Sequence, residues 1–240
     1  RAVRIRMKKG DLMRDEILAA AEKLFFTNGY EDTGVQDILD ALKLSKGGFY
    51  HYFNSKESVM REICERRIAE RLRRVEPELY VCRARPIDKL NRLLKLVGIF
   101  DWNDAQYAAI MLRLCYKDGG DAQLRESLRR SARDQLRPYL DETIAEGIAS
   151  GKMCPRYSNR AGEIVLRMAD DLNDEACALL SKDPENLDSI LEITDRVHAY
   201  RDAIEVLLGA PFGSIWLYDM PVLVGDLRRA MRVMGKNGGK

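Results

Sequence analysis

The stretch LSKGGFYHYFNSKESV, residues 44–59, places two adjacent glycines directly before a run of aromatic side chains and a histidine. Tandem glycine is unfavourable within a helix, by about 1 kcal/mol per glycine relative to alanine. A buried core does not normally take Tyr50, His51 and Tyr52 in succession, whereas Phe49 and Phe53 share one helical face. The pattern predicts a short helix that its phenylalanines hold on the protein while its other side chains meet a ligand outside the fold.

Basic side chains gather around this segment, although the whole chain is nearly neutral, with 40 basic and 38 acidic residues. Residues 41–56 contain three lysines and no acid, and residues 1–14 contain six basic residues and one acid. Such patches favour a polyanion. Glycine allows a close backbone approach to DNA, and hydroxyl, imidazole and ammonium groups bind phosphates and base edges. The alternative is that the aromatic residues only cover a small core.

Two more helices are predicted before this segment. Residues 11–30 carry apolar side chains at helical spacing from Ile17 to Phe25, and Gly29 supplies a left-handed stop. Residues 33–42 form a second, short helix, which either Thr33 and Gln36 cap as a capping box or Gly34 caps alone.

The helix of the opening stretch begins at Lys46, with Ser45 as its cap, and a long fourth helix starts near residue 55 and ends near Pro77. Two short helices joined by a brief turn are typical of a helix-turn-helix, whose second helix enters the major groove of DNA.

Residues 14–63 resemble the TetR family of transcriptional repressors. The matching positions, in order, are Ile17, Leu18, Ala21, Leu24, Phe25, Gly29, Tyr30, Thr33, Ile38, Ser45, Lys46, Gly47, Tyr50, Tyr52, Phe53, Ser55, Lys56 and Glu57. The resemblance implies DNA contacts by Gln36, Ser45, Lys46, Gly47, Gly48, Tyr50, His51, Tyr52 and Lys56. The chain departs from the family pattern at Gly34, where a second threonine is common, and at Lys43, which must either adopt the backbone of a turn glycine or shift it.

The remaining sequence predicts an all-α chain with a DNA-binding domain at 1–56, including a basic N-terminal arm, and a larger effector-binding and dimerisation domain at 57–240. Helices are predicted over 86–100, 103–117, 121–150, 159–181, 187–208 and 220–233. Four arginines recur every fourth residue from Arg125 to Arg137. They form either a solvated face or a contact with an anion or an acidic neighbouring helix.

The resemblance also implies an effector cavity among the middle helices and a dimer interface on the last long pair. The candidate cavity residues, each of which could instead be plain core, are Phe100, Trp102, Tyr107, Met111 and Cys115. The candidate interface residues are Ile164, Met168, Leu172, Ile190, Val197 and Ile204.

Other classes of protein are not indicated. The chain has no apolar run of membrane-spanning length, no apolar signal segment at its basic start, and five widely spaced cysteines that suggest neither disulfides nor zinc. No catalytic or cofactor motif is present, so we expect no enzyme, no cofactor and no metal. We predict a cytoplasmic repressor that binds a palindrome in double-stranded DNA as a homodimer and is released by a small molecule. The alternative is a helical protein-interaction module without DNA binding.

Overall fold

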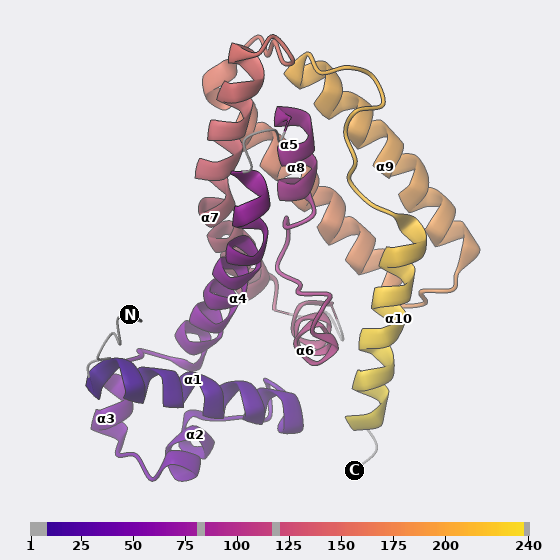
Figure 1. Cartoon of the computed structure of the whole chain (residues 1–240). Coiled ribbons are helices and arrows are strands. Elements are labelled where there is room, and N and C mark those ends of the chain that lie inside the picture. Colours follow the sequence, from indigo (N-terminus) through magenta and orange to yellow (C-terminus); the bar gives the residue numbers. More distant parts are fainter. Residues whose placement is uncertain (1–8, 81–84, 117–120, 238–240) are drawn as a thin grey trace. The chain divides into compact units, whose positions relative to one another are not determined.

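The computed structural model describes residues 9–80, 85–116 and 121–237, and these residues form helices without any strand (Figure 1). The helices are α1 (Lys9–Asn28), α2 (Val35–Leu42), α3 (Lys46–Tyr50), α4 (Lys56–Leu79), α5 (Pro86–Leu94), α6 (Ala105–Tyr116), α7 (Ala122–Ala149), α8 (Ser158–Leu180), α9 (Leu187–Leu208) and α10 (Met220–Asn237). The predicted all-α class is confirmed. The basic arm before Lys9 lies outside the described residues.

The chain divides into two compact units, residues 1–64 and 65–240, so the boundary falls inside α4 and not at its start. The first turns of α4 belong to the N-terminal unit because Val59, Met60 and Ile63 are buried there. The helix-turn-helix elements α2 and α3 therefore share one unit with α1, which precedes them in the chain, and with the beginning of α4, which follows them.

Arg14 ties these supporting helices together. Its Nε donates to both carboxylate oxygens of Glu62 on α4, at 2.8 and 2.9 Å. Its guanidinium lies 4.7 Å from the ring centre of Phe53, and its Nη1 donates to the carbonyl oxygen of Tyr52. The hydrogen bond to Glu62 raises the pKa of Arg14. Arg14 is one of the six basic residues in the stretch 1–14. In the fold it links the backbone of Tyr52, just after α3, to Glu62 on α4.

The turn between α2 and α3 depends on Lys43. Its backbone lies in the left-handed region, with φ 53° and ψ 41°, and no other non-glycine residue in the described ranges has a positive φ. Of the two alternatives, Lys43 thus adopts the conformation of the turn glycine that it replaces.

Replacing Lys43 by glycine is expected to stabilise the N-terminal unit by about 0.5–1 kcal/mol. The left-handed backbone costs a non-glycine residue about 1–2 kcal/mol, and glycine loses about 0.5–1 kcal/mol more conformational freedom on folding. Urea unfolding followed by circular dichroism measures the change. The control is Lys23→Gly at an exposed site within α1, which should destabilise by about 1 kcal/mol. Loss of stability in both variants would contradict the strain argument.

The second unit is built around α7 and α8, with α5 and α6 packed on α7, α9 packed on α8, and α10 packed on α6 (Figure 1). The inner face of α7 carries an apolar residue at every fourth position, and all five are buried: Leu124, Leu128, Ala132, Leu136 and Leu140. One expectation was wrong: α5 ends at Leu94 and does not continue to residue 100. Gly98 has φ 98°, which no regular helix accommodates, and the chain runs irregularly from there to α6.

The arginines of α7 face the acidic residues of α8. Arg129 bonds to Asp170 at 3.0 Å and to Asp171 at 2.7 Å, and Arg133 also reaches the carboxylate of Asp170. Asp170 is fully buried. Burial alone would lower the pKa of Arg129, but the carboxylates of Asp170 and Asp174 outweigh it and the pKa is raised. Of the two interpretations of the arginine row, the acidic neighbouring helix is correct for Arg129 and Arg133.

Candidate nucleic-acid interface and effector cavity

The helix α3 is short and is capped as predicted. The Oγ of Ser45 accepts a hydrogen bond from the N–H of Gly48 at 3.1 Å. Phe49 is fully buried and Phe53 is almost fully buried, so both aromatic anchors lie in the core of the N-terminal unit. The face of α3 that carries Phe49 is therefore buried, and the opposite face is the one that can contact a ligand.

The two glycines of α3 have different surroundings. A Cβ added to Gly48 would lie 2.8 Å from the end of the Leu44 side chain, so an alanine here would require that side chain to move. A Cβ added to Gly47 would meet no atom within 4 Å. Packing therefore does not explain a glycine at position 47, whereas a surface that the backbone must approach closely does.

The outer face of α3 carries the predicted contact residues. Lys46 and His51 are exposed and Tyr50 is 53% exposed, while Tyr52 is half-buried with its ring edge against His51, 4.8 Å between centroids. All four residues lie on α3 or within two residues of its end.

On α2, Gln36 is exposed and its Nε2 donates to Asp40 at 2.7 Å. The capping box with Thr33 is wrong, because Thr33 is buried and donates to the carbonyl oxygen of Gly29 at 2.7 Å. Gly34 is the N-cap, and its N–H is bound by the carboxylate of Asp37 at 2.7 Å. Gln36 therefore takes no part in capping α2.

Lys56 has a structural role that sequence reasoning missed. Its Nζ donates to the carbonyl oxygen of Tyr30 at 2.7 Å and lies 4.2 Å from the centre of the Tyr30 ring. The side chain is half-buried. Lys56 therefore joins the start of α4 to the segment after α1, and its substitution would disturb the fold as well as any phosphate contact.

The second unit contains a cavity of about 780 Å³, a volume typical of sites for drug-sized ligands. It is lined by residues of α4, the connection after α5, α8, α9, the segment between α9 and α10, and α10 itself. The largest lining side chains are aromatic: Trp102, Trp216 and Tyr218. Eight aliphatic side chains add to this wall: Val75, Leu96, Val97, Val197, Ile215, Leu217, Val222 and Leu223.

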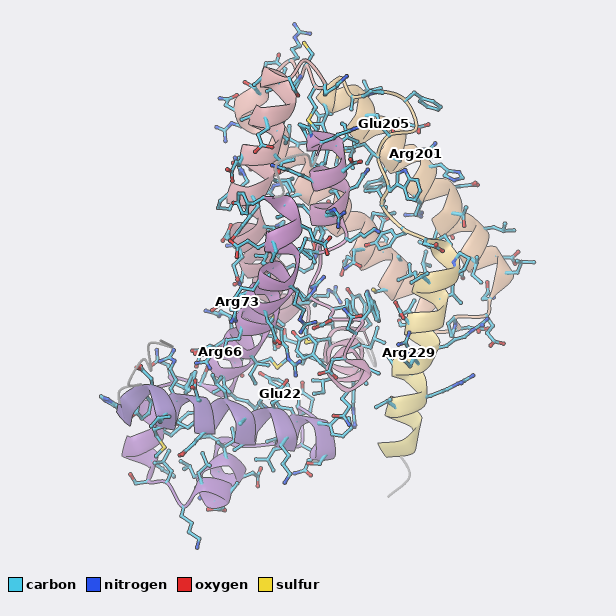
Figure 2. The ribbon with its side chains drawn as sticks, viewed as in Figure 1. Glu22, Arg66, Arg73, Arg201, Glu205 and Arg229 are labelled. Atoms are coloured by element: carbon cyan, nitrogen blue, oxygen red, sulfur yellow. The ribbon has the colours of Figure 1, made fainter. Side chains whose placement is uncertain are left out.

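The segment between α9 and α10 forms one wall of the cavity and is held by two side chains. The carboxylate of Glu205, on α9 and only 3% exposed, accepts from the N–H groups of Gly213 and Ile215 at 3.0 and 2.9 Å. Figure 2 shows Glu205 beside this segment. Asn91 on α5 accepts from the N–H of Trp216 and donates to the carbonyl oxygen of Ser214, both at 2.8 Å.

Of the five predicted cavity residues, only Trp102 lines this cavity. Phe100, Tyr107, Met111 and Cys115 are at most 2% exposed and belong to the core. Phe100 stacks on Trp102 at 4.6 Å between centroids and so supports the wall from behind. The face of α6 that the sequence pattern selected points inward, to the other helices, because an apolar stripe marks burial and does not distinguish a core from a cavity.

The predicted interface residues fall into two groups. Leu172 and Ile204 are fully buried within one chain and belong to the core of the second unit, while Val197 is 7% exposed and lines the cavity, so these three are corrected as candidates for the interface. Ile164 is 37% exposed, and Met168 and Ile190 are half-buried. Strongly exposed apolar side chains that the pattern did not select are Leu187, Leu191 and Val206 on α9.

Within the described ranges no helix is both long and apolar enough to cross a membrane. The same ranges hold no group of His, Cys, Asp and Glu residues that is arranged to bind a metal ion.

Comparison with known proteins agrees with the geometry of the N-terminal unit. Residues 17–63 match the family model for bacterial regulatory proteins of the tetR family. The chain is 25% identical over 153 residues to the HTH-type transcriptional repressor NicS of Pseudomonas putida, covering 62% of this chain and 72% of NicS. It is 50% identical over 44 residues to the uncharacterized HTH-type transcriptional regulator YuxN of Bacillus subtilis, 18% of this chain and 15% of YuxN.

A solved structure of similar fold is GusR of Salmonella enterica, with a TM-score of 0.51 and 18% identity over 85% of this chain and all of that one. The helix-turn-helix geometry and the family match agree over residues 17–63, and the likeness to GusR shows a shared fold over most of the chain. Residues 17–63 therefore form a helix-turn-helix of the tetR type, and the chain is similar to TetR-family proteins, which are DNA-binding transcription regulators and not enzymes.

Proposed function

We propose that this protein is a ligand-responsive repressor, which binds a palindromic operator as a homodimer and is released when a small molecule enters the cavity of the second unit. Such a regulator works where the DNA is, in the cytoplasm of a bacterium. The observation that carries the proposal is Gly47. The fold leaves open space beside its Cα, within the acid-free segment 41–56 that also carries Lys46, Tyr50 and His51.

Geometry supports a dimer for this function. A single short helix in one groove contacts few base pairs, whereas two copies related by a two-fold axis read two half-sites one helical turn apart. The apolar side chains exposed on α8 and α9, among them Ile164 and Val206, offer a surface for that pairing. The cavity supports the effector role, because it has the size of an organic ligand and lies apart from the α2–α3 surface in the sequence.

The test uses duplexes that the purified protein selects from a random library, with binding measured by fluorescence anisotropy at several salt concentrations. Lys46→Ala should weaken binding by about 1 kcal/mol on every sequence and flatten the salt slope by about one, because a phosphate contact reads no bases. Tyr50→Ala should weaken binding by at least about 1 kcal/mol. Gly47→Ala should weaken binding without lowering the melting temperature, since the added methyl group has room in the protein alone and alanine is the better helix former.

Lys23→Ala is the matched control, because Lys23 is an exposed lysine of the same unit that lies on α1. It should change neither affinity nor salt slope by a comparable amount. If all three α3 variants bind DNA with wild-type affinity, the proposal that α3 recognises DNA is wrong. If no duplex is selected at all, the protein-interaction module becomes the better function.

A further inference from the structure

We infer that the cavity of the second unit binds an apolar molecule carrying a protonated amine, and that the carboxylate of Asp101 holds that amine. This inference rests on the proposed effector role of the cavity and adds the chemical class of the effector. It starts from one side chain whose hydrogen bonds are incomplete.

Asp101 lines the cavity and is only 1% exposed. Its Oδ1 accepts a hydrogen bond from the N–H of Asn103 at 3.2 Å, which fixes the orientation of the carboxylate. Its Oδ2 is buried and accepts no hydrogen bond from the part of the chain that the structure describes. The Nη2 of Arg74 lies 3.7 Å away, beyond hydrogen-bond distance. A buried acceptor without a donor is unfavourable, so a ligand that brings an N–H to Oδ2 gains that bond.

Three of the four lysine and arginine side chains that line the cavity are already engaged, so an anionic ligand is not favoured. Arg71 donates to the carbonyl oxygens of Leu96 and Gly98, at 3.0 and 3.3 Å. Arg74 pairs with Glu70 at 3.1 Å, and Arg201 pairs with Asp202 at 2.8 Å. Lys95 is exposed. Two more carboxylates, Asp219 and Asp226, also line the cavity, and Asp226 pairs with Arg229, which Figure 2 labels on α10.

The rest of the wall suits an apolar body with a cationic end. The ring of Trp102 follows Asp101 directly and lines the same cavity. An ammonium that reaches Asp101 lies beside this indole, where a cation gains from the ring electrons. An ion-paired hydrogen bond is also about twice as strong as a neutral one, which favours an amine over an alcohol at Oδ2. The aliphatic side chains named above receive the remainder of the ligand.

Three probes of one shape and different heads test the inference: phenylbutylamine, phenylbutanol and phenylbutyrate. The chain has two tryptophans, and both line the cavity, so quenching of tryptophan fluorescence reports binding there. The wild-type protein should bind the amine about tenfold tighter than the alcohol, because the ion-paired bond is the stronger one. The butyrate should bind weakest. Asp101→Asn keeps the Oδ1 acceptor for Asn103 and should abolish the preference, lowering amine affinity about tenfold with little effect on the alcohol.

Asp134→Asn is the matched control at an exposed site of α7 and should keep the preference. Tightest binding of the butyrate, an amine preference that survives Asp101→Asn, or no saturable quenching by any probe would each overturn the inference. The order of affinities of the three probes for the wild-type protein tests the inference even if a variant fails to fold.

A second experiment with the selected duplex separates this inference from the proposed function. If the amine binds without releasing DNA, the ligand class stands and effector release fails; if the ligand-free protein does not bind DNA, the proposed function fails independently of the ranking.

Discussion

Replacing Asp170 by asparagine is expected to lower the free energy of unfolding of the second unit by about 3 kcal/mol. Asp170 is fully buried between α7 and α8 and accepts from Arg129 and Arg133. Burial raises the pKa of Asp170 while the two guanidiniums oppose that shift. The neutral amide removes the charge that both arginines face in a buried site, and a buried ion that loses its partner keeps its full desolvation cost. The loss therefore exceeds the net worth of the intact network, which is small.

The neighbouring residue is the control for this prediction. Asp171 also bonds to Arg129, at 2.7 Å, but its side chain is 59% exposed. Asp171→Asn should therefore cost no more than about 1 kcal/mol, because solvent screens exposed ion pairs. Urea unfolding followed by tryptophan fluorescence, at one fixed protein concentration, measures both variants, since Trp102 and Trp216 both lie in the second unit. Equal midpoints for the two variants would mean that burial does not set the strength of this network.

Local sequence was sufficient to predict most of the helices, because their signals lie within a few residues. The predicted helix over 187–208 has the bounds found in the structure. Ser45 is read correctly as a cap because its hydroxyl needs only Gly48, three residues on. Where two local signals compete, sequence alone does not decide. Thr33 looks like a capping residue, but it is buried and turns its hydroxyl back to Gly29.

The cavity depends on contacts that no local pattern contains. Its wall joins Asp101 to side chains of α4, α8 and α10, which are far apart in the chain. The α6 residues chosen from the sequence share an apolar face, and that face fills the core. Whether Glu205 is a surface residue or the clamp of the segment after α9 is likewise decided by Gly213 and Ile215, which lie beyond the end of its helix. The lack of a hydrogen-bond donor to Oδ2 of Asp101 can be recognised only when the positions of all the surrounding donors are known.

The proposed dimer surface must be sought among residues that one chain leaves exposed. Ile204 fills the core and Val197 lines the cavity, so charging both would unfold the protomer and say nothing about pairing. The ion pair between Arg196 and Glu175 sets the antiparallel register of α9 and α8. Apolar side chains that one chain leaves exposed on these two helices include Ile164 of α8, 37% exposed, and Val206 of α9, 83% exposed.

Replacing Val206 by aspartate is expected to raise the dimer dissociation constant at least about 1,000-fold while the protomer stays folded. A buried, unpaired carboxylate costs several kcal/mol, two-fold symmetry brings two of them into one interface, and each 1.4 kcal/mol is a factor of ten. Sedimentation velocity over a range of concentrations measures the shift, and the selected palindrome should be bound correspondingly less well. Val222→Asp, at a 56% exposed valine of α10, is the matched control. If Val206→Asp sediments as the wild type and Val222→Asp as a monomer, the pairing surface lies on the segment from Trp216 to Met231 instead of on α8 and α9.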